Sequence, residues 1–264
     1  MEGMTPASFR DMCMDANDAL ALGRFWAAVL GERLDKQEDG TALLVPDSGR
    51  RAERMWMCPV PEPRGAKTRV HFDVRLPGAQ PSDVIEAGAT VIRAPGEHHW
   101  WVLADPEGNE FCAFPAKPAD AASAAEPEDA APAAEPEDAA PAAEPEGAQP
   151  AGVFELVVDS RDCLAQATWW SGIVGGEVRR ADGGQFAWIE GASEFPWQYW
   201  VFVDVPEPKT VKNRLHWDVN LAGDRPDALL DAGASLLRSP GGDIGWWVLA
   251  DPEGNEFCAF PAKP

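Results

Sequence analysis

The sequence is short of cysteine, of basic residues and of long apolar runs, and each shortage excludes a class of protein. Its five cysteines are an odd number at irregular spacing. This is untypical of a secreted disulfide framework and favours a reduced, cytoplasmic protein. No stretch approaches the ~20 consecutive apolar residues of a membrane span. The N-terminus, MEGMTPASFRDM, has no basic region followed by an apolar run, so we expect no secretory signal.

Basic residues are half as numerous as acidic ones, 22 against 44, which gives a formal net charge of −22. Such a chain repels phosphates, and this argues against nucleic acid as a partner. It favours neutral or cationic ligands instead. A glycine-rich phosphate loop, a nucleophile elbow and a CxxC pair are also missing from the sequence. The partner we expect is therefore a small molecule, with neither a membrane nor a nucleic acid involved.

What the sequence has instead is a long internal repeat. WWVLADPEGNEFCAFPAKP stands at Trp100–Pro118 and again, without a change, at Trp246–Pro264. Further upstream, VPEPRGAKTRVHFDV (Val60–Val74) aligns without gaps to VPEPKTVKNRLHWDV (Val205–Val219). Self-similarity of this extent indicates two copies of one domain. The protein is therefore expected to carry two related sites.

A low-complexity segment at 119–150 separates the two copies. The motif AAEPEDAAP recurs there at a nine-residue period, proline is frequent, and nine carboxylates occur without a base. Such a segment cannot bury enough apolar surface to offset the entropy of ordering it. We predict a disordered, extended acidic linker between a first domain at 1–118 and a second domain at 151–264.

Within each copy, short strands alternate with helices. Asn17 or Asp18 can cap a helix that ends at about Leu30, before Gly31. Turn residues separate the strands that follow. The expected strands of the first copy are Phe9–Met14, Leu34–Gln37, Ala42–Val45, Arg54–Val60, Arg69–Leu76, Thr90–Arg93, Trp100–Ala104 and Glu110–Phe114. Each copy thus has the order βαβββ followed by βαβββ, which predicts an α+β fold with mixed sheets.

Three motifs resemble the vicinal oxygen chelate superfamily: FW-x-x-V-L-G at the end of the first helix, H-x-D-V at mid-domain and the terminal D-P-E-G-N-E-F-C. This superfamily contains glyoxalase I, bleomycin-resistance proteins and extradiol dioxygenases. The sequence looks most like its glyoxalase-like branch common in actinobacteria. The resemblance covers both copies. It implies paired βαβββ modules whose curved mixed sheets form a cup around a ligand, with the two domains pairing within the chain or through homodimerisation.

The resemblance also implies a divalent metal held by one ligand from each of the first, fourth, fifth and eighth strands. By position, the two ligand sets are Asp11, Glu53, His71 and Cys112, and Glu155, Gln198, His216 and Cys258. The fourth-strand place is equally well filled by Met55, Met57 or Trp200. Such a set suits zinc, with iron or manganese as further possibilities. The eighth-strand ligand of the catalytic relatives is a glutamate, however, and its replacement by cysteine favours a cup without metal.

The face that each strand presents to the cup follows from strand alternation. His71, Asp73 and Arg75 share one face of their strand, opposite Phe72 and Val74. The chain also has twelve tryptophans, and each Trp-Trp pair places one ring on each face of its strand. Flat aromatic walls bind planar or cationic ligands. The expected ligand-binding residues are His71, Asp73, Trp101 and Cys112 in the first copy, and His216, Asp218, Trp247 and Cys258 in the second.

Three functions are compatible with this pattern. The favoured one is a small-molecule binding protein that sequesters an aromatic or cationic compound, as bleomycin-resistance proteins do in antibiotic resistance. The second is a metal-dependent lyase, isomerase or dioxygenase. The third is a metal-free enzyme in which Asp11 or Glu155 acts as general base, because burial would raise the pKa of such a carboxyl.

Overall fold

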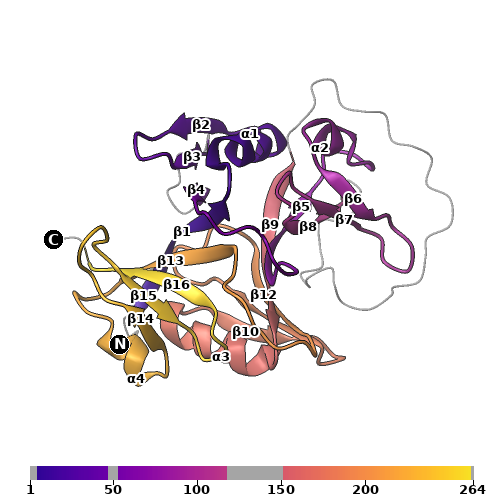
Figure 1. Ribbon diagram of the computed structural model, residues 1–264. Coiled ribbons are helices and arrows are strands. Elements are labelled where there is room, and N and C mark those ends of the chain that lie inside the picture. Colours follow the sequence, from indigo (N-terminus) through magenta and orange to yellow (C-terminus); the bar gives the residue numbers. More distant parts are fainter. Residues whose placement is uncertain (1–4, 47–52, 118–150, 263–264) are drawn as a thin grey trace.

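The computed structural model describes residues 5–46, 53–117 and 151–262, so the linker predicted at 119–150 lies outside the described residues. The described chain forms four βαβββ modules in succession (Figure 1). Module 1 comprises β1 (Ala7–Ala16), α1 (Ala19–Leu30), β2 (Arg33–Lys36), β3 (Ala42–Val45) and β4 (Met55–Pro59). Module 2 comprises β5 (Val70–Arg75), α2 (Ser82–Glu86), β6 (Thr90–Arg93), β7 (Trp101–Ala104) and β8 (Glu110–Phe114).

The second repeat has the same order of elements. Module 3 comprises β9 (Gly152–Ser160), α3 (Cys163–Val174), β10 (Glu177–Arg180), β11 (Phe186–Glu190) and β12 (Tyr199–Asp204). Module 4 comprises β13 (Leu215–Leu221), α4 (Asp227–Asp231), β14 (Ser235–Arg238), β15 (Trp247–Ala250) and β16 (Glu256–Phe260). The predicted α+β fold with mixed sheets is confirmed.

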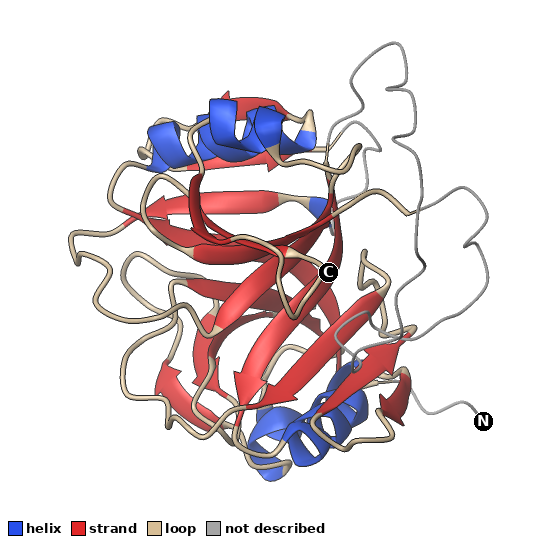
Figure 2. Ribbon diagram, turned by 90° about the vertical axis from the view of Figure 1, so that its right-hand side faces the viewer, coloured by secondary structure: helices blue, strands red, loops and turns tan. Residues whose placement is uncertain are grey.

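The strands form two eight-stranded sheets, and each sheet takes four strands from each repeat. Sheet A has the order β14-β15-β16-β13-β1-β4-β3-β2, so it joins modules 1 and 4. Sheet B has the order β10-β11-β12-β9-β5-β8-β7-β6 and joins modules 2 and 3. The seams are the antiparallel pairs β1 with β13 and β5 with β9. Figure 2 shows both sheets strongly curved, with the helices on their outer sides.

The long helices begin and end where the local sequence directs. The Asp18 carboxylate accepts a hydrogen bond from the backbone N–H of Ala21 and caps α1, and Asp162 caps α3 in the same way. Gly31 ends α1 in the left-handed conformation, at φ 66°, where a side chain would be strained. Among the described helices, none is long and apolar enough to cross a bilayer.

One continuous hydrophobic core joins the helices to both sheets. Trp26 of α1 packs edge-on against Phe72 of sheet B, with ring centroids 5.8 Å apart. Trp170 of α3 lies 5.1 Å from Trp217 of sheet A and 5.1 Å from Trp200 of sheet B. Both helical tryptophans are fully buried. Each long helix thereby contacts the sheet of its own module and also the other sheet.

The repeated Asp-Pro-Glu-Gly-Asn turn makes a second connection between the sheets. Glu107, in the β7–β8 turn of sheet B, accepts hydrogen bonds from the backbone N–H groups of Asn17 and Asp18 at the start of α1. Glu253, in the β15–β16 turn of sheet A, receives the same two bonds at the start of α3. Gly108 has φ 84°, a left-handed conformation that glycine adopts without strain. The identical segments thus perform identical structural tasks.

Candidate functional site

Each sheet carries a set of polar side chains on the face opposite the core, and we call these faces cup A and cup B. Cup A is formed where β1, β13, β16 and β4 meet. Asp11 lies directly opposite Asp218 in the β1–β13 pairing, and Cys13 lies opposite His216. Cys258 lies beside Asp218 in the parallel β13–β16 pairing. All five side chains therefore come together on one face.

The contacts within cup A are short and polar. Nε2 of His216 lies 3.7 Å from the Sγ atom of Cys258 and 3.8 Å from Oδ1 of Asp218. The Cys13 thiol lies 3.7 Å from Oδ2 of Asp218. The indole N–H of Trp56, on β4, donates to Oδ2 of Asp11 at 3.3 Å.

Cup B has the corresponding arrangement on β5, β8, β9 and β12. Nε2 of His71 lies 3.5 Å from Oδ1 of Asp73 and 3.8 Å from Sγ of Cys112. Asp73 pairs in register with Glu155 across the sheet seam, and Glu155 pairs on its other side with Tyr199. Asp73 and Glu155 are almost completely buried. The histidine–aspartate–cysteine group is common to both cups.

The structure regroups the ligand sets that were assigned by repeat. Asp11 belongs to cup A with His216 and Cys258, whereas His71 and Cys112 belong to cup B with Glu155. The reason is that each seam joins the first strand of one repeat to the fifth strand of the other. The first-strand position of each repeat therefore lies beside the fifth-strand and eighth-strand positions of the other repeat.

The fourth-strand assignments are also corrected. Glu53 lines a second hollow with Glu32, Met55 and Trp197, away from cup A. Met55, Met57 and Trp200 are buried in the hydrophobic core. Alternation along β4 instead turns Trp56 and Cys58 toward cup A, because Trp56 pairs with Cys13. Gln198 is exposed and reaches cup B only through its side-chain amide, which donates to the Tyr199 hydroxyl at 2.7 Å.

Trp101 and Trp247 were expected to face the cups, but in each Trp-Trp pair it is the other ring that does so. Trp101 and Trp247 pack against the hydrophobic core. Their neighbours Trp100 and Trp246 stack on Phe114 and Phe260, with centroids 5.3 and 5.1 Å apart. Trp101 pairs with Ala113, a core residue, whereas Val102 pairs with Cys112. Strand alternation predicts that the two rings of a pair lie on opposite faces, but it does not predict which ring enters the core.

Three groups that sequence reasoning missed also line the cups: Cys13, Cys58 and an aromatic wall. The wall lies in cup B, where Phe186, Trp188 and Tyr199 cluster with Val157 and Val201. A usable signal existed for Cys13, since it follows Asp11 by two residues on a strand and therefore shares its face. No comparable signal existed for Cys58, whose register depends on the length of the preceding loop.

Burial controls the protonation of the cup residues. Desolvation lowers the pKa of His71 and of His216 from 6.5 to about 4, so both imidazoles are neutral at neutral pH. In cup A, burial and then the adjacent Asp11 carboxylate raise the pKa of Asp218 well above its ordinary value. Asp218 therefore resists ionisation in this cup.

We expect the two cup histidines to remain neutral in mildly acidic solution. In an NMR titration of ring-labelled protein, their imidazole signals should shift near pH 4 instead of pH 6.5. Because the folded-state pKa is depressed, each histidine removes stability as pH falls from about 6.5 to about 4. A titration midpoint near 6.5 for both rings would show that the cups are open to water.

The residues required by the family metal site fit it poorly. Among the described residues, the donor groups that lie within 4.8 Å of one another are Cys13, His216 and Asp218 in cup A, and His71, Asp73 and Cys112 in cup B. The first-strand acids Asp11 and Glu155 belong to neither group. Arg10 lies 3.6 Å from Asp11 and Trp56 donates to it. The ligand pattern implied by the resemblance is therefore not assembled from the expected residues.

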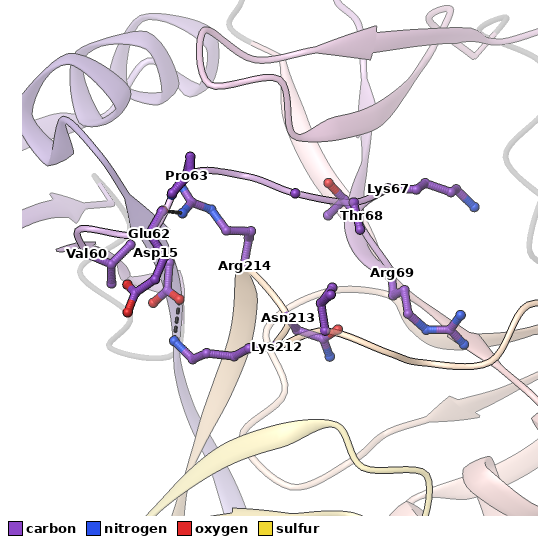
Figure 3. A pocket seen from close by; sticks show the side chains of 13 residues that line it. Asp15, Val60, Glu62, Pro63, Lys67, Thr68, Arg69, Lys212, Asn213 and Arg214 are labelled. Atoms are coloured by element: carbon purple, nitrogen blue, oxygen red, sulfur yellow. Dashed lines mark hydrogen bonds and ion pairs between the residues drawn. The ribbon is translucent and has the colours of Figure 1, made fainter.

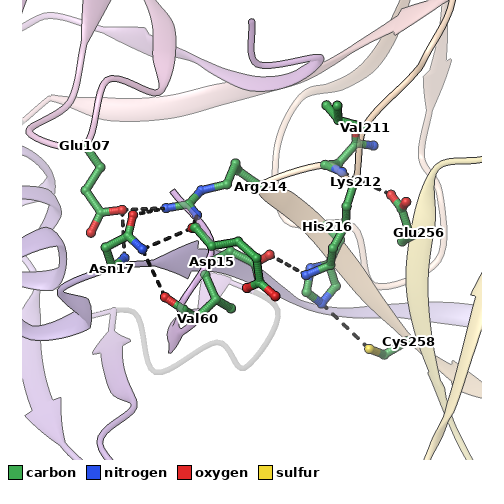
Figure 4. A network of polar contacts seen from close by, with 12 residues as sticks. Asp15, Asn17, Val60, Glu107, Val211, Lys212, Arg214, His216, Glu256 and Cys258 are labelled. Carbon is green, nitrogen blue, oxygen red and sulfur yellow. Dashed lines mark hydrogen bonds and ion pairs between the residues drawn. The ribbon is translucent and has the colours of Figure 1, made fainter. Parts of the chain in front are cut away.

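A cavity of about 360 Å³ lies between two loops that lead from one sheet to the other (Figure 3). One loop joins β4 to β5, and the other joins β12 to β13. Lys212 forms an ion pair with Asp15 there, at the end of β1. Figure 4 shows the polar contacts beside this cavity. Arg214, which lines the cavity, binds Glu107 at 2.6 Å, and His216 contacts Cys258. Asp15 and Lys212 act electrostatically on His216. The cavity thus adjoins cup A.

The comparisons with known proteins agree with this architecture. A family model described as a glyoxalase-like domain matches residues 11–114 and again residues 155–260. These two matches span most of the chain, so the protein belongs to the glyoxalase-like family, and the resemblance to the vicinal oxygen chelate superfamily with two tandem copies is confirmed.

Among solved structures, glyoxalase I from Zea mays is similar with a TM-score of 0.60 at 13% sequence identity, over 96% of this chain and 92% of that chain. A glyoxalase/bleomycin resistance protein/dioxygenase family enzyme from Burkholderia phytofirmans is 26% identical over 38% of this chain and 92% of its own, with a TM-score of 0.31. The comparison with curated proteins gives no match. The similarity to the maize enzyme shows the fold alone.

Proposed function

We propose that the protein binds a small organic molecule with aromatic or cationic groups in cup B. The aromatic wall supports this proposal, because Phe186, Trp188 and Tyr199 form one cluster on the same face as His71 and Asp73. Binding sites for small molecules are concave, mostly apolar and supplied with a few polar groups. Cup B has this composition. Sequestration of a toxic compound would be the corresponding role in the cell.

The observation that carries the proposal is the position of two buried carboxyl groups beside that wall. Glu155 lies between Asp73 and Tyr199 in the sheet register, and both acids are at most 1% exposed. Two carboxyl groups close together favour positive charge beside them. An organic cation seated against Tyr199 and Trp188 would be attracted to both acids and would itself gain cation–π attraction.

Isothermal titration calorimetry with aromatic cations and their neutral analogues tests this proposal. Asp73→Asn should weaken cation binding by about tenfold or more, since about 1.4 kcal/mol of charge attraction is lost, and should leave the neutral analogue nearly unaffected. Trp188→Ala should weaken the binding of both the cation and the neutral analogue. Glu177→Gln, on the exposed strand β10, is the matched control and should change neither affinity. Cation affinity unchanged in both cup variants would contradict the proposal.

A metal-dependent lyase, isomerase or dioxygenase is the second candidate. It is favoured by the histidine–aspartate–cysteine group in each cup, whose neutral imidazoles are in the form that binds metal ions. It predicts one ion in each cup and turnover that is lost on chelation. Elemental analysis of protein purified without chelator or affinity metal separates the two candidates.

A further inference from the structure

Large apolar side chains that stay exposed gather at two places on the molecule. Of the six such residues in the described chain, five lie at the outer ends of modules 2 and 4, where the sheets end in β6 and β14 (Figure 1). They are Ile85, Val91 and Ile92 in module 2, and Leu236 and Leu237 in module 4. We call these two surfaces the β6 corner and the β14 corner. Single exposed apolar residues are common, but groups of them mark interaction sites.

The four outer strands of the two sheets differ in how they are protected against other chains. In β2 and in β10, three of the four residues are charged, a composition that prevents foreign strands from pairing with a sheet edge. In β6 and in β14, one residue of the four is charged, and all four residues of each strand are exposed. The β6 and β14 edges are therefore the ones open to a partner.

A bulge in β6 determines what kind of contact this edge can make. Val91 pairs with Leu103 and Arg93 pairs with Val102, so Ile92 is an extra residue in the strand, and its side chain is 53% exposed. A bulge interrupts the regular ladder of hydrogen bonds and twists the edge. We therefore expect a partner to contact β6 through side chains, without extending the sheet by a further strand.

Charge distinguishes the β6 corner from the β14 corner. Arg238, at the end of β14, forms an ion pair with Asp243 of its own loop. Arg93, at the end of β6, is exposed and forms no ion pair with any described residue, and the same is true of Glu86 at the end of α2. The β6 corner thus has three exposed apolar residues against two, together with one uncompensated charge of each sign.

We propose that two copies of this chain associate through their β6 corners about a twofold axis, with the two β6 strands antiparallel. A twofold axis brings the same surface of both chains together, so the surface must be complementary to itself. Glu86 lies just before the start of β6, and Arg93 ends the strand. The antiparallel arrangement brings Arg93 of each copy to the Glu86 end of the other, so that unlike charges meet twice around the apolar residues. The interface is small, and the dimer is therefore weak and reversible.

Sedimentation equilibrium of the full chain tests the proposal directly. The experiment is run with a reducing agent, which prevents cross-linking through the five cysteines. It is also run at about 0.15 M salt, where the Debye length of about 8 Å screens the long-range repulsion between two acidic chains. The average mass should rise from that of one chain toward that of two chains as the concentration increases from micromolar to submillimolar.

Four variants locate the interface. Ile92→Asp should weaken association at least about tenfold, because it places a charge in the apolar contact. Leu237→Asp adds the same charge at the β14 corner and is the matched control, which should associate as the wild type does. Arg93→Glu should also weaken association, and Glu86→Arg combined with Arg93→Glu should restore it. A mass that stays at one chain, a mass that grows beyond two chains, an equal loss in Leu237→Asp, or no recovery in the double variant would overturn the proposal.

Discussion

Replacement of Asp251 by alanine is expected to lower the free energy of unfolding by about 3–5 kcal/mol. The Asp251 carboxylate accepts hydrogen bonds from the backbone N–H groups of Glu253 and Asn255 and from the Asn255 side chain. It also accepts from the indole of Trp170 at 3.1 Å and from the amide of Gln166, both on α3. The variant leaves several buried donors unsatisfied, and such groups cost about 1–3 kcal/mol each. Urea unfolding followed by tryptophan fluorescence measures the loss.

The first repeat provides the control for this prediction. Asp105 accepts from Glu107 and Asn109 in the same turn, but Leu22 replaces Gln166 at the corresponding helical position. Asp105→Ala should therefore cost less than Asp251→Ala. An equal cost at both sites would show that the link to the Gln166 amide contributes nothing.

The same carboxyl group makes a prediction about pH. Burial raises the pKa of Asp251 from 3.8 to about 6, so the folded state binds the proton more tightly than the unfolded chain does. The stabilisation from this group is therefore present at pH 4 and is lost as pH rises through 6. The cost of Asp251→Asn should fall by about 2.4 kcal/mol between pH 4 and pH 7, because one pKa unit corresponds to about 1.4 kcal/mol and part of the loss already occurs below pH 4. A pH-independent cost would contradict the raised pKa.

The second large effect is expected when the chain is cut between residues 118 and 150. The two fragments should stay together at micromolar concentration, because both sheets are completed only by strands of both repeats. The β1–β13 seam alone pairs Ala7 through Met14 with Leu221 through Leu215. Size-exclusion chromatography with light scattering should give the mass of the uncut protein, and denaturing electrophoresis should show two bands. Separation of the fragments in native buffer would contradict the seam pairing.

The second repeat alone, residues 151–264, should then form a homodimer. In the isolated repeat, β9 lacks β5 and β13 lacks β1, so two sheet edges with unpaired backbone groups are exposed. A second copy can pair its β13 with β9 of the first, in the antiparallel sense seen at both seams. Light scattering should report twice the fragment mass. A folded monomer would show that one repeat closes on itself.

The sequence predicted local structure well because the relevant forces act locally. A helix cap at Asn17 or Asp18, the Gly31 stop and the alternation of His71 and Asp73 against Phe72 all follow from neighbouring residues. The structure places the cap at Asp18 and confirms the other two. The predicted strands Ala42–Val45, Thr90–Arg93 and Glu110–Phe114 have the observed bounds. The repeat also predicted two related residue groups, and each copy places its histidine beside an aspartate and a cysteine.

Long-range pairing is what the sequence could not decide. Two related copies offer β5 and β13 two candidate partners, β1 and β9, so alternation places Asp11 on a face without saying whether His71 or His216 lies opposite. Connections and packing settle that choice in the folded chain. Glu53 failed for a related reason, because one residue of register exchanges the core face for the cup face.

The distance in sequence between the seam strands has a consequence for synthesis on the ribosome. Sheet B is complete once β12 has emerged, whereas β1 waits for β13, about 200 residues later. At 5–20 residues per second, this delay lasts roughly 10–40 s. During that time β1 is paired with β4 on one side only, and its other edge is open. The nascent N-terminal quarter therefore keeps an open sheet edge, to which another chain can pair, for longer than any other described module.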